Sequence, residues 1–176
     1  MTKYFLNALL IFAISYLAYA GDISPSEAST TLSVQITIAR NKASRQKGLM
    51  DKSELLPQEG LLLVFEPQTP IRLWAKRVHH DLDIAFLDTS GQVLSITRLP
   101  CHPKLNQELE SHPEKEPLLD LEFAKHQIEG PLQAIYALEM SPGFFLHNHI
   151  KEGDHLIWKA DENQISTIRV LRQKKS

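Results

Sequence analysis

The chain has 176 residues, with 19 basic and 21 acidic side chains and a formal net charge of -2. This length suits a single domain that buries its own core. The balanced charge excludes the strongly basic surface that is typical of nucleic-acid binding, so we expect no nucleic-acid partner. Cys101 is the only cysteine, which excludes a disulfide within the chain.

The first twenty residues have the features of a secretory signal peptide. Lys3 precedes an apolar run from Phe5 to Leu17, and Ala18-Tyr19-Ala20 places small residues where a signal peptidase reads them. A membrane anchor is the competing interpretation, but the run is shorter than the ~20 residues that span a bilayer. We therefore expect residues 1–20 to be removed and the mature protein to be periplasmic or secreted, without a membrane span.

The region after the signal predicts a flexible linker over residues 21–31 and one β-rich domain over residues 32–172. Leu32 to Ile38 alternate apolar and polar side chains, as a half-buried strand does. Asn41 can cap a short helix over residues 41–46, and Gly48 can end it. The continuous apolar run from Leu61 to Phe65 indicates a strand that is covered on both faces.

Later segments add further strands and short helices. A strand is expected over residues 71–75, and residues 84–87 and 92–97 flank a turn that predicts a hairpin. Strands are also expected over residues 133–138, 156–159 and 165–171. The region 113–127 predicts one amphipathic helix inside a long loop, and Ser141-Pro142 predicts the start of another short helix. The expected fold class is all-β, a mainly antiparallel sandwich or barrel with two or three short helices.

Six segments, in a fixed order along the chain, resemble a known family. They are Gly48-Leu49-Met50, Glu59 to Phe65, Leu73 to Asp88, Gly91 to Ile96, Ala134 to Glu139, and Gly153-Asp154. Together they resemble a bacterial and archaeal family known as domain-of-unknown-function family 192, over about residues 34–158. The resemblance implies a compact β-sandwich with small helical additions, and the family has no established reaction.

Residues 74–83 contain an aromatic side chain, two cations, two imidazoles and two carboxylates within ten positions. The family pattern here is Trp-Met-Lys-Asn-Thr, followed by Pro-Leu-Asp. This chain keeps Trp74, Lys76, Leu82 and Asp83. It departs from the pattern at Ala75, Arg77, Val78 and Asp81. These departures suggest a changed ligand preference or a lapsed site.

We expect a ligand-binding site formed by Trp74, Lys76, Arg77 and Asp83. On an extended strand, Trp74 and Lys76 would share one face, while Arg77 and Asp83 would share the other and open onto a common concave surface. Trp74 would stack on a ring, and the guanidinium of Arg77 would pair with a carboxylate or phosphate. The structural alternative is that Trp74 fills the core, Lys76 lies along the surface and Asp83 caps a turn.

Three functions agree with these features. The leading one is a non-catalytic exported module that binds an unknown small molecule or an envelope protein, with no catalytic residue, metal or cofactor. The first alternative is a metal-dependent hydrolase with His79, Asp81 and Asp83 as ligands, although their spacing matches no recognised metal motif. The second alternative is a structural component of the envelope. The sequence contains no nucleophile elbow or phosphate-binding loop.

Overall fold

The computed structural model describes residues 29–173. The predicted signal peptide and residues 21–28 of the predicted linker lie outside the described residues. Strand β1 already begins at Ser29, so it includes the last three residues of that predicted linker.

The described chain forms nine strands and four short α-helices, which confirms the all-β class and adds one helix to the expected number. The strands are β1 (Ser29–Ala39), β2 (Glu59–Val64), β3 (Arg72–Leu73), β4 (Leu82–Leu87), β5 (Val93–Leu99), β6 (Ile128–Glu129), β7 (Tyr136–Met140), β8 (His155–Asp161) and β9 (Gln164–Leu171). The helices are α2 (Lys42–Lys47), α3 (Pro103–Ser111), α4 (Glu116–Ala124) and α5 (Phe144–His147), with a 3-10 turn η1 (Pro113–Lys115).

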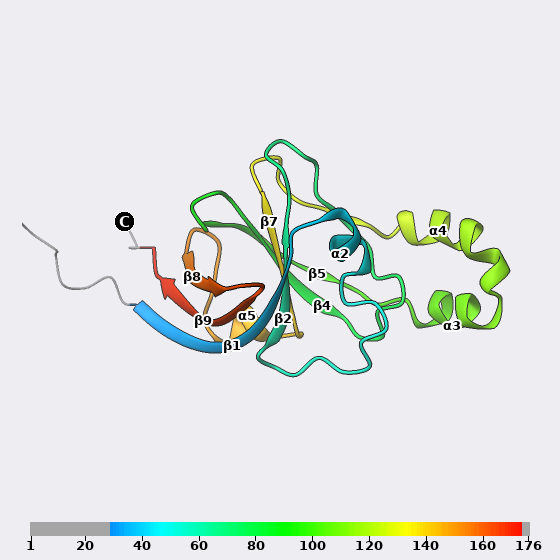
Figure 1. The fold of residues 1–176 in the computed structure, drawn as a ribbon, viewed down its shortest axis with the longest axis horizontal. Helices are drawn as coiled ribbons and strands as arrows, with labels where there is room; N and C mark the ends of the chain where they lie inside the picture. Colours follow the sequence, from blue (N-terminus) through cyan, green and yellow to red (C-terminus); the bar gives the residue numbers. More distant parts are fainter. Residues whose placement is uncertain (1–28, 174–176) are drawn as a thin grey trace, which may run out of the picture.

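Seven strands form one strongly curved sheet in the order β5-β4-β7-β2-β1-β9-β8 (Figure 1). All neighbouring pairs are antiparallel except β1 and β2, which α2 connects as a parallel crossover. The two ends of the sheet meet, because Gln92 bridges to His155 and the Leu156 N–H donates to the Gly91 carbonyl at 2.9 Å. The sheet is therefore a largely closed barrel.

The sheet has an apolar cluster on each face. The inner cluster includes Leu62, Leu138 and Met140, and the outer cluster includes Leu61 and Leu63. Strand β2 is thus covered on both faces, as its continuous apolar run predicts. Strand β7 lies between β2 and β4, so its side chains also alternate between the two clusters.

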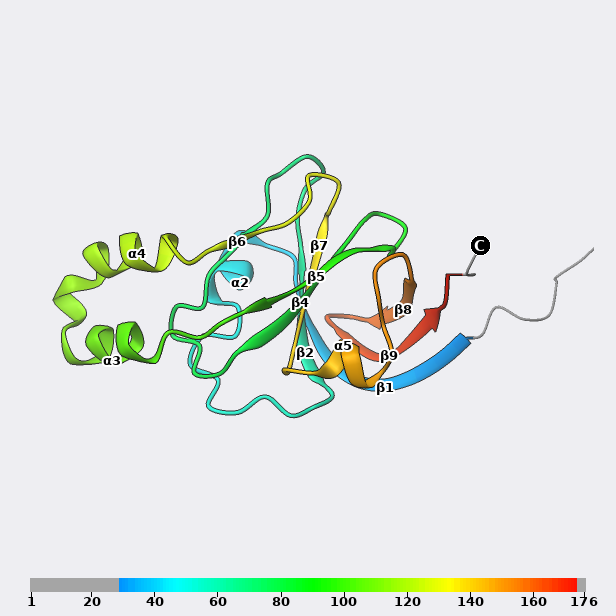
Figure 2. The ribbon, with the colours of Figure 1, turned by 180° about the vertical axis from the view of Figure 1, so that it is seen from behind.

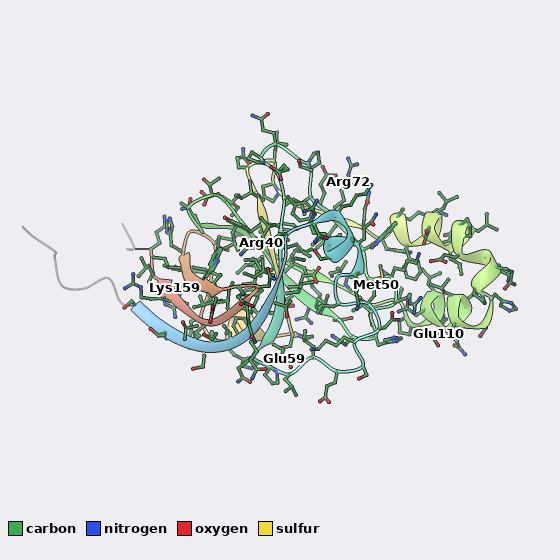
Figure 3. All side chains as sticks on the ribbon, in the orientation of Figure 1. Arg40, Met50, Glu59, Arg72, Glu110 and Lys159 are labelled. Atoms are coloured by element: carbon green, nitrogen blue, oxygen red, sulfur yellow. The ribbon has the colours of Figure 1, made fainter. Side chains whose placement is uncertain are left out.

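A helical hairpin of α3 and α4 projects from one end of the barrel, away from the end where β1 begins (Figure 2). Glu110 on α3 and Lys159 on β8 mark these opposite ends (Figure 3). The short helix expected within residues 113–127 is confirmed as α4, but the sequence did not predict α3, which pairs with it. Leu105 and Leu109 pack against Leu119 and Phe123, so the two helices share a small core of their own. Among the helices of residues 29–173, none has the length and apolarity to cross a membrane.

Candidate functional site

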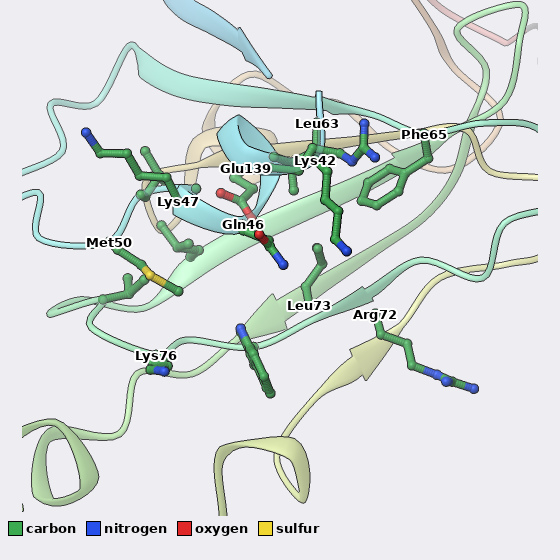
Figure 4. A pocket seen from close by; sticks show the side chains of 16 residues that line it. Lys42, Gln46, Lys47, Met50, Leu63, Phe65, Arg72, Leu73, Lys76 and Glu139 are labelled. Carbon is green, nitrogen blue, oxygen red and sulfur yellow. The ribbon is translucent and has the colours of Figure 1, made fainter. Parts of the chain in front are cut away.

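A cavity of about 260 Å³ lies beneath α2, on the outer face of the sheet (Figure 4). Helix α2 and the residues that follow it line one side, and β3 with the loop after it lines the other. Strands β2 and β7 form the floor. Most of the wall is apolar and comes from Leu49, Leu63, Phe65, Leu73, Val78 and Leu82.

The floor of the cavity contains one acidic side chain, Glu139. Its neighbours in register are Leu61 on β2 and Ile84 on β4, which both belong to the outer apolar cluster. Directly opposite residues on adjacent strands share a face, so the Glu139 carboxyl points into this cluster and reaches the cavity. Figure 4 shows its carboxyl turned toward the open space below α2.

Burial changes the protonation of Glu139. The side chain is only 5% exposed, and its carboxyl has no hydrogen-bond or ion-pair partner among residues 29–173. Removal of the carboxyl from water raises its pKa from 4.5 to about 8, because the ionised form loses its hydration. No nearby cation offsets this shift. The group is therefore mainly a neutral acid at pH 7.

Helix α2 covers the cavity without burying any residue of its own. Asn41 and Ser44 form a reciprocal capping box, in which the Ser44 N–H donates to the Asn41 side chain at 2.9 Å. Arg45 ties the helix to the sheet by donating to the Val64 carbonyl at 2.9 Å and by lying over the Phe65 ring. A polar helix is thus held in place by its cap and one arginine.

The mouth of the cavity is basic. Five cations line it, and three of them are engaged: Arg45 with the backbone, Arg72 with Glu129, and Lys76 with α4. Lys42 and Lys47, both on α2, have no side-chain partner within the part of the chain that the structure describes. In Figure 4 the Lys42 side chain extends toward the opening.

Two of the four predicted site residues line this cavity. Trp74 is 38% exposed at its edge, so the alternative that it fills the core is wrong. Lys76 is buried, and its ammonium lies 2.6 Å from Glu116 and 2.5 Å from Asp120. Burial alone would lower the pKa of Lys76, but these two carboxylates outweigh it and the pKa is raised. Lys76 therefore fastens the helical hairpin to the barrel.

The other two predicted residues, Arg77 and Asp83, lie outside the lining of this cavity and do not share a concave surface. The Arg77 guanidinium donates to Asp51 at 2.7 Å, in an exposed pair. Asp83 is buried on β4, where it accepts from Arg98 at 2.8 Å and from the Gly143 N–H at 2.7 Å. Asp83 thus links β4 to β5 and to the turn before α5.

The strand expected over residues 71–75 is present but shorter than expected, because β3 covers only Arg72 and Leu73. Arg77 has a φ of 55°, a left-handed conformation that ends any alternation of faces. Asn106 on α3 fixes this turn: its side chain accepts from the Arg77 N–H and donates to the Val78 carbonyl, each at 2.8 Å.

The proposed metal face is not assembled either. The Asp81 carboxylate accepts from the Cys101 N–H at 2.9 Å, and Asp83 is committed to Arg98. Within residues 29–173, no group of three or more His, Cys, Asp or Glu side chains is arranged to hold a metal ion.

Sequence reasoning did not select Glu139, Lys42 or Gln46 for the site. A usable signal for Glu139 existed: it is the one acidic residue in the apolar strand Tyr136–Met140. A charged side chain in a strand that is covered on both faces needs a reason other than packing. The two α2 residues carry no comparable signal, because their place over the cavity follows from the crossover between β1 and β2.

The comparisons with known proteins agree with this architecture. A protein from Sinorhizobium meliloti 1021, named as a proposed transcription regulator, has 19% identity and a TM-score of 0.55; the match covers 77% of this chain and 95% of that one. A protein of unknown function from Novosphingobium aromaticivorans DSM 12444 has 23% identity and a TM-score of 0.53, covering 70% and 74%. At these identities the likeness shows the fold alone. No curated protein matches the chain.

The family model of DUF192, described as "Uncharacterized ACR", matches residues 24–158. This range contains β1 to β7, α5 and the first part of β8, and thus every residue that lines the cavity. The match covers well over half of the sequence and agrees with the resemblance of residues 34–158. This chain belongs to the DUF192 family.

Proposed function

We propose that this chain is an exported binding module that holds a small molecule in the cavity beneath α2. The observation that carries the proposal is the Glu139 carboxyl, which is buried at the cavity floor without a partner in the described chain. The apolar wall suits a small apolar body, and Glu139 offers one polar group that fixes its orientation.

The energetic cost of Glu139 supports a role in binding. A buried carboxyl without a partner destabilises the fold, whereas an apolar side chain of similar length would pack there without that cost. At pH 7, the shift of its pKa from 4.5 to about 8 corresponds to roughly 3 kcal/mol. A ligand that supplies the missing partner would recover part of this free energy.

A thermal-shift experiment tests the binding function, because a ligand that binds only the native state raises its melting temperature. The probes are n-hexylamine, n-hexanol and hexanoate, which share a six-carbon body and differ in the end group. We expect at least one probe to raise the melting temperature of the mature protein. Glu139→Gln should reduce this increase, and Glu54→Gln, which changes an exposed carboxyl outside the cavity, should not. The absence of any shift, or an equal shift in Glu139→Gln, would contradict the proposal.

Export is the second part of the proposed function. It is supported by Lys3, the apolar run from Phe5 to Leu17 and the small residues of Ala18-Tyr19-Ala20. We predict that the mature chain begins at Gly21. Expression of the full chain with fractionation, followed by intact-mass measurement, checks this. A product that retains residues 1–20 and stays with the membrane fraction would overturn it.

A further inference from the structure

The cavity beneath α2 has two chemically different ends. The floor contains one carboxyl, Glu139, and the mouth contains the ammonium of Lys42, which, like that of Lys47, has no side-chain partner among residues 29–173. None of the five cations that line the cavity lowers the raised pKa of Glu139. These cations therefore do not lie next to its carboxyl. Leu63 and Leu73 belong to the apolar wall of the same cavity.

We propose that the ligand is a short zwitterion whose ammonium group pairs with Glu139, whose apolar spacer lies against Leu63 and Leu73, and whose carboxylate meets Lys42. A linear ω-amino acid has this pattern of groups. The inference rests on the proposed binding function and specifies its ligand class.

An ammonium group suits the floor better than a neutral or anionic group does. The surroundings of Glu139 are apolar, and its carboxyl has no donor from the described chain. A buried carboxylate becomes favourable only when a cation pairs with it. A ligand carboxylate at the same place would leave two acids in an apolar space, where at most one could ionise.

The other end of the ligand meets a basic mouth. Lys42 is exposed and has no side-chain partner in the described part of the chain, while Gln46 adds an amide from the same helix. Lys47 lines the same rim, and Arg45, Arg72 and Lys76 already have partners. A carboxylate at the mouth would gain a charge-assisted hydrogen bond from Lys42, which is worth about tenfold in affinity.

This arrangement links binding to the release of a proton. Below its pKa of about 8, the folded protein holds Glu139 in the neutral acid form. When the ligand ammonium binds, the carboxyl gives its proton to the solvent and stays as a carboxylate against the cation; the ligand keeps its own protons. Nearly one proton should therefore be released for each ligand bound at about pH 6.5.

Isothermal titration calorimetry of the mature protein at about pH 6.5 tests this, in two buffers with different ionisation enthalpies. The probes are 6-aminohexanoate, n-hexylamine and hexanoate. We expect 6-aminohexanoate to bind about tenfold more tightly than n-hexylamine, with release of nearly one proton. Lys42→Met should remove the tenfold advantage but keep the proton release. Glu139→Gln should abolish the proton release. Lys159→Met, which removes a lysine at the far end of the barrel, should change neither.

The outcomes separate this inference from the broader proposal. If n-hexylamine binds and 6-aminohexanoate binds no better, the zwitterion inference is wrong and the binding function stands. If hexanoate binds most tightly, or if the proton count is zero or reversed, the assignment of the ammonium to Glu139 is wrong. If none of these probes nor n-hexanol binds, both proposals fail.

Discussion

Glu139→Met should stabilise the folded protein by about 4–5 kcal/mol at pH 8 and above, relative to its effect below about pH 4.5. The sign follows from the pKa of Glu139, which is raised from 4.5 to about 8 in the folded state. Between these values the folded chain holds a proton that the unfolded chain releases. The free energy of unfolding therefore falls as pH rises from about 5 to 8, at about 1.4 kcal/mol per pH unit.

Chemical denaturation of wild type and variant across this pH range measures the effect. His80 and His102 act in the opposite direction, because burial lowers the pKa of each and their contribution to stability rises with pH. The difference between wild type and Glu139→Met cancels these histidine contributions. Glu54→Gln serves as the control, since its exposed carboxyl should leave the curve unchanged. Parallel curves for wild type and Glu139→Met would show that the carboxyl is hydrated in the folded protein.

The proposed binding function gives a reason for a costly acid at the floor of a cavity. A wall closed by apolar side chains would give a more stable barrel, because buried polar groups without partners oppose folding. The trade of stability for a preorganised polar group is common at binding sites. Helix α2 buries none of its own residues. Its role in the structure is to cover the cavity, and packing is left to Leu49, which follows it.

The strands were predictable from the sequence because each has a local cause. Apolar and polar residues alternate from Leu32 to Ile38, which predicts a strand with one covered face. The apolar run from Leu61 to Phe65 predicts a strand covered on both faces, and the structure confirms both strands. The hairpin of β4 and β5 is confirmed for the same reason, with its turn closed by Asp88, which accepts from the Ser90 N–H at 2.8 Å. The parallel pairing of β1 with β2 has no local cause, and the sequence did not predict it.

The site was not predictable to the same degree, because it depends on contacts between distant segments. Arg77 takes a left-handed conformation that a single residue of α3, Asn106, holds in place from 29 positions away. This turn buries Lys76 and directs Arg77 toward Asp51. The polar and charged residues that lie close together in the sequence therefore do not share one surface. The cavity instead combines α2, β2, β3 and β7.

Leu63→Ala should lower the free energy of unfolding by about 2–5 kcal/mol. Leu63 is only 2% exposed, lies between β1 and β7, and belongs to the outer apolar cluster. Its truncation removes buried apolar surface and leaves a space that the paired strands cannot close. Leu146→Ala is the matched control: this side chain is 77% exposed on α5, and its loss should cost less than about 0.5 kcal/mol. A loss below about 1 kcal/mol for Leu63→Ala would contradict the burial of this wall.

The same truncation should change which ligand fits, because Leu63 also lines the cavity beneath α2. Removal of its branched end widens the apolar space beside the spacer, and engineered space of this kind accepts additional apolar atoms, such as the extra methylenes of a longer chain that bends into it. The affinity for 8-aminooctanoate, relative to 6-aminohexanoate, should therefore be higher in Leu63→Ala than in the wild type. Titration of both proteins with both compounds measures this ratio. A ratio that does not change would mean that the spacer does not lie against Leu63, even if the stability loss is as large as expected.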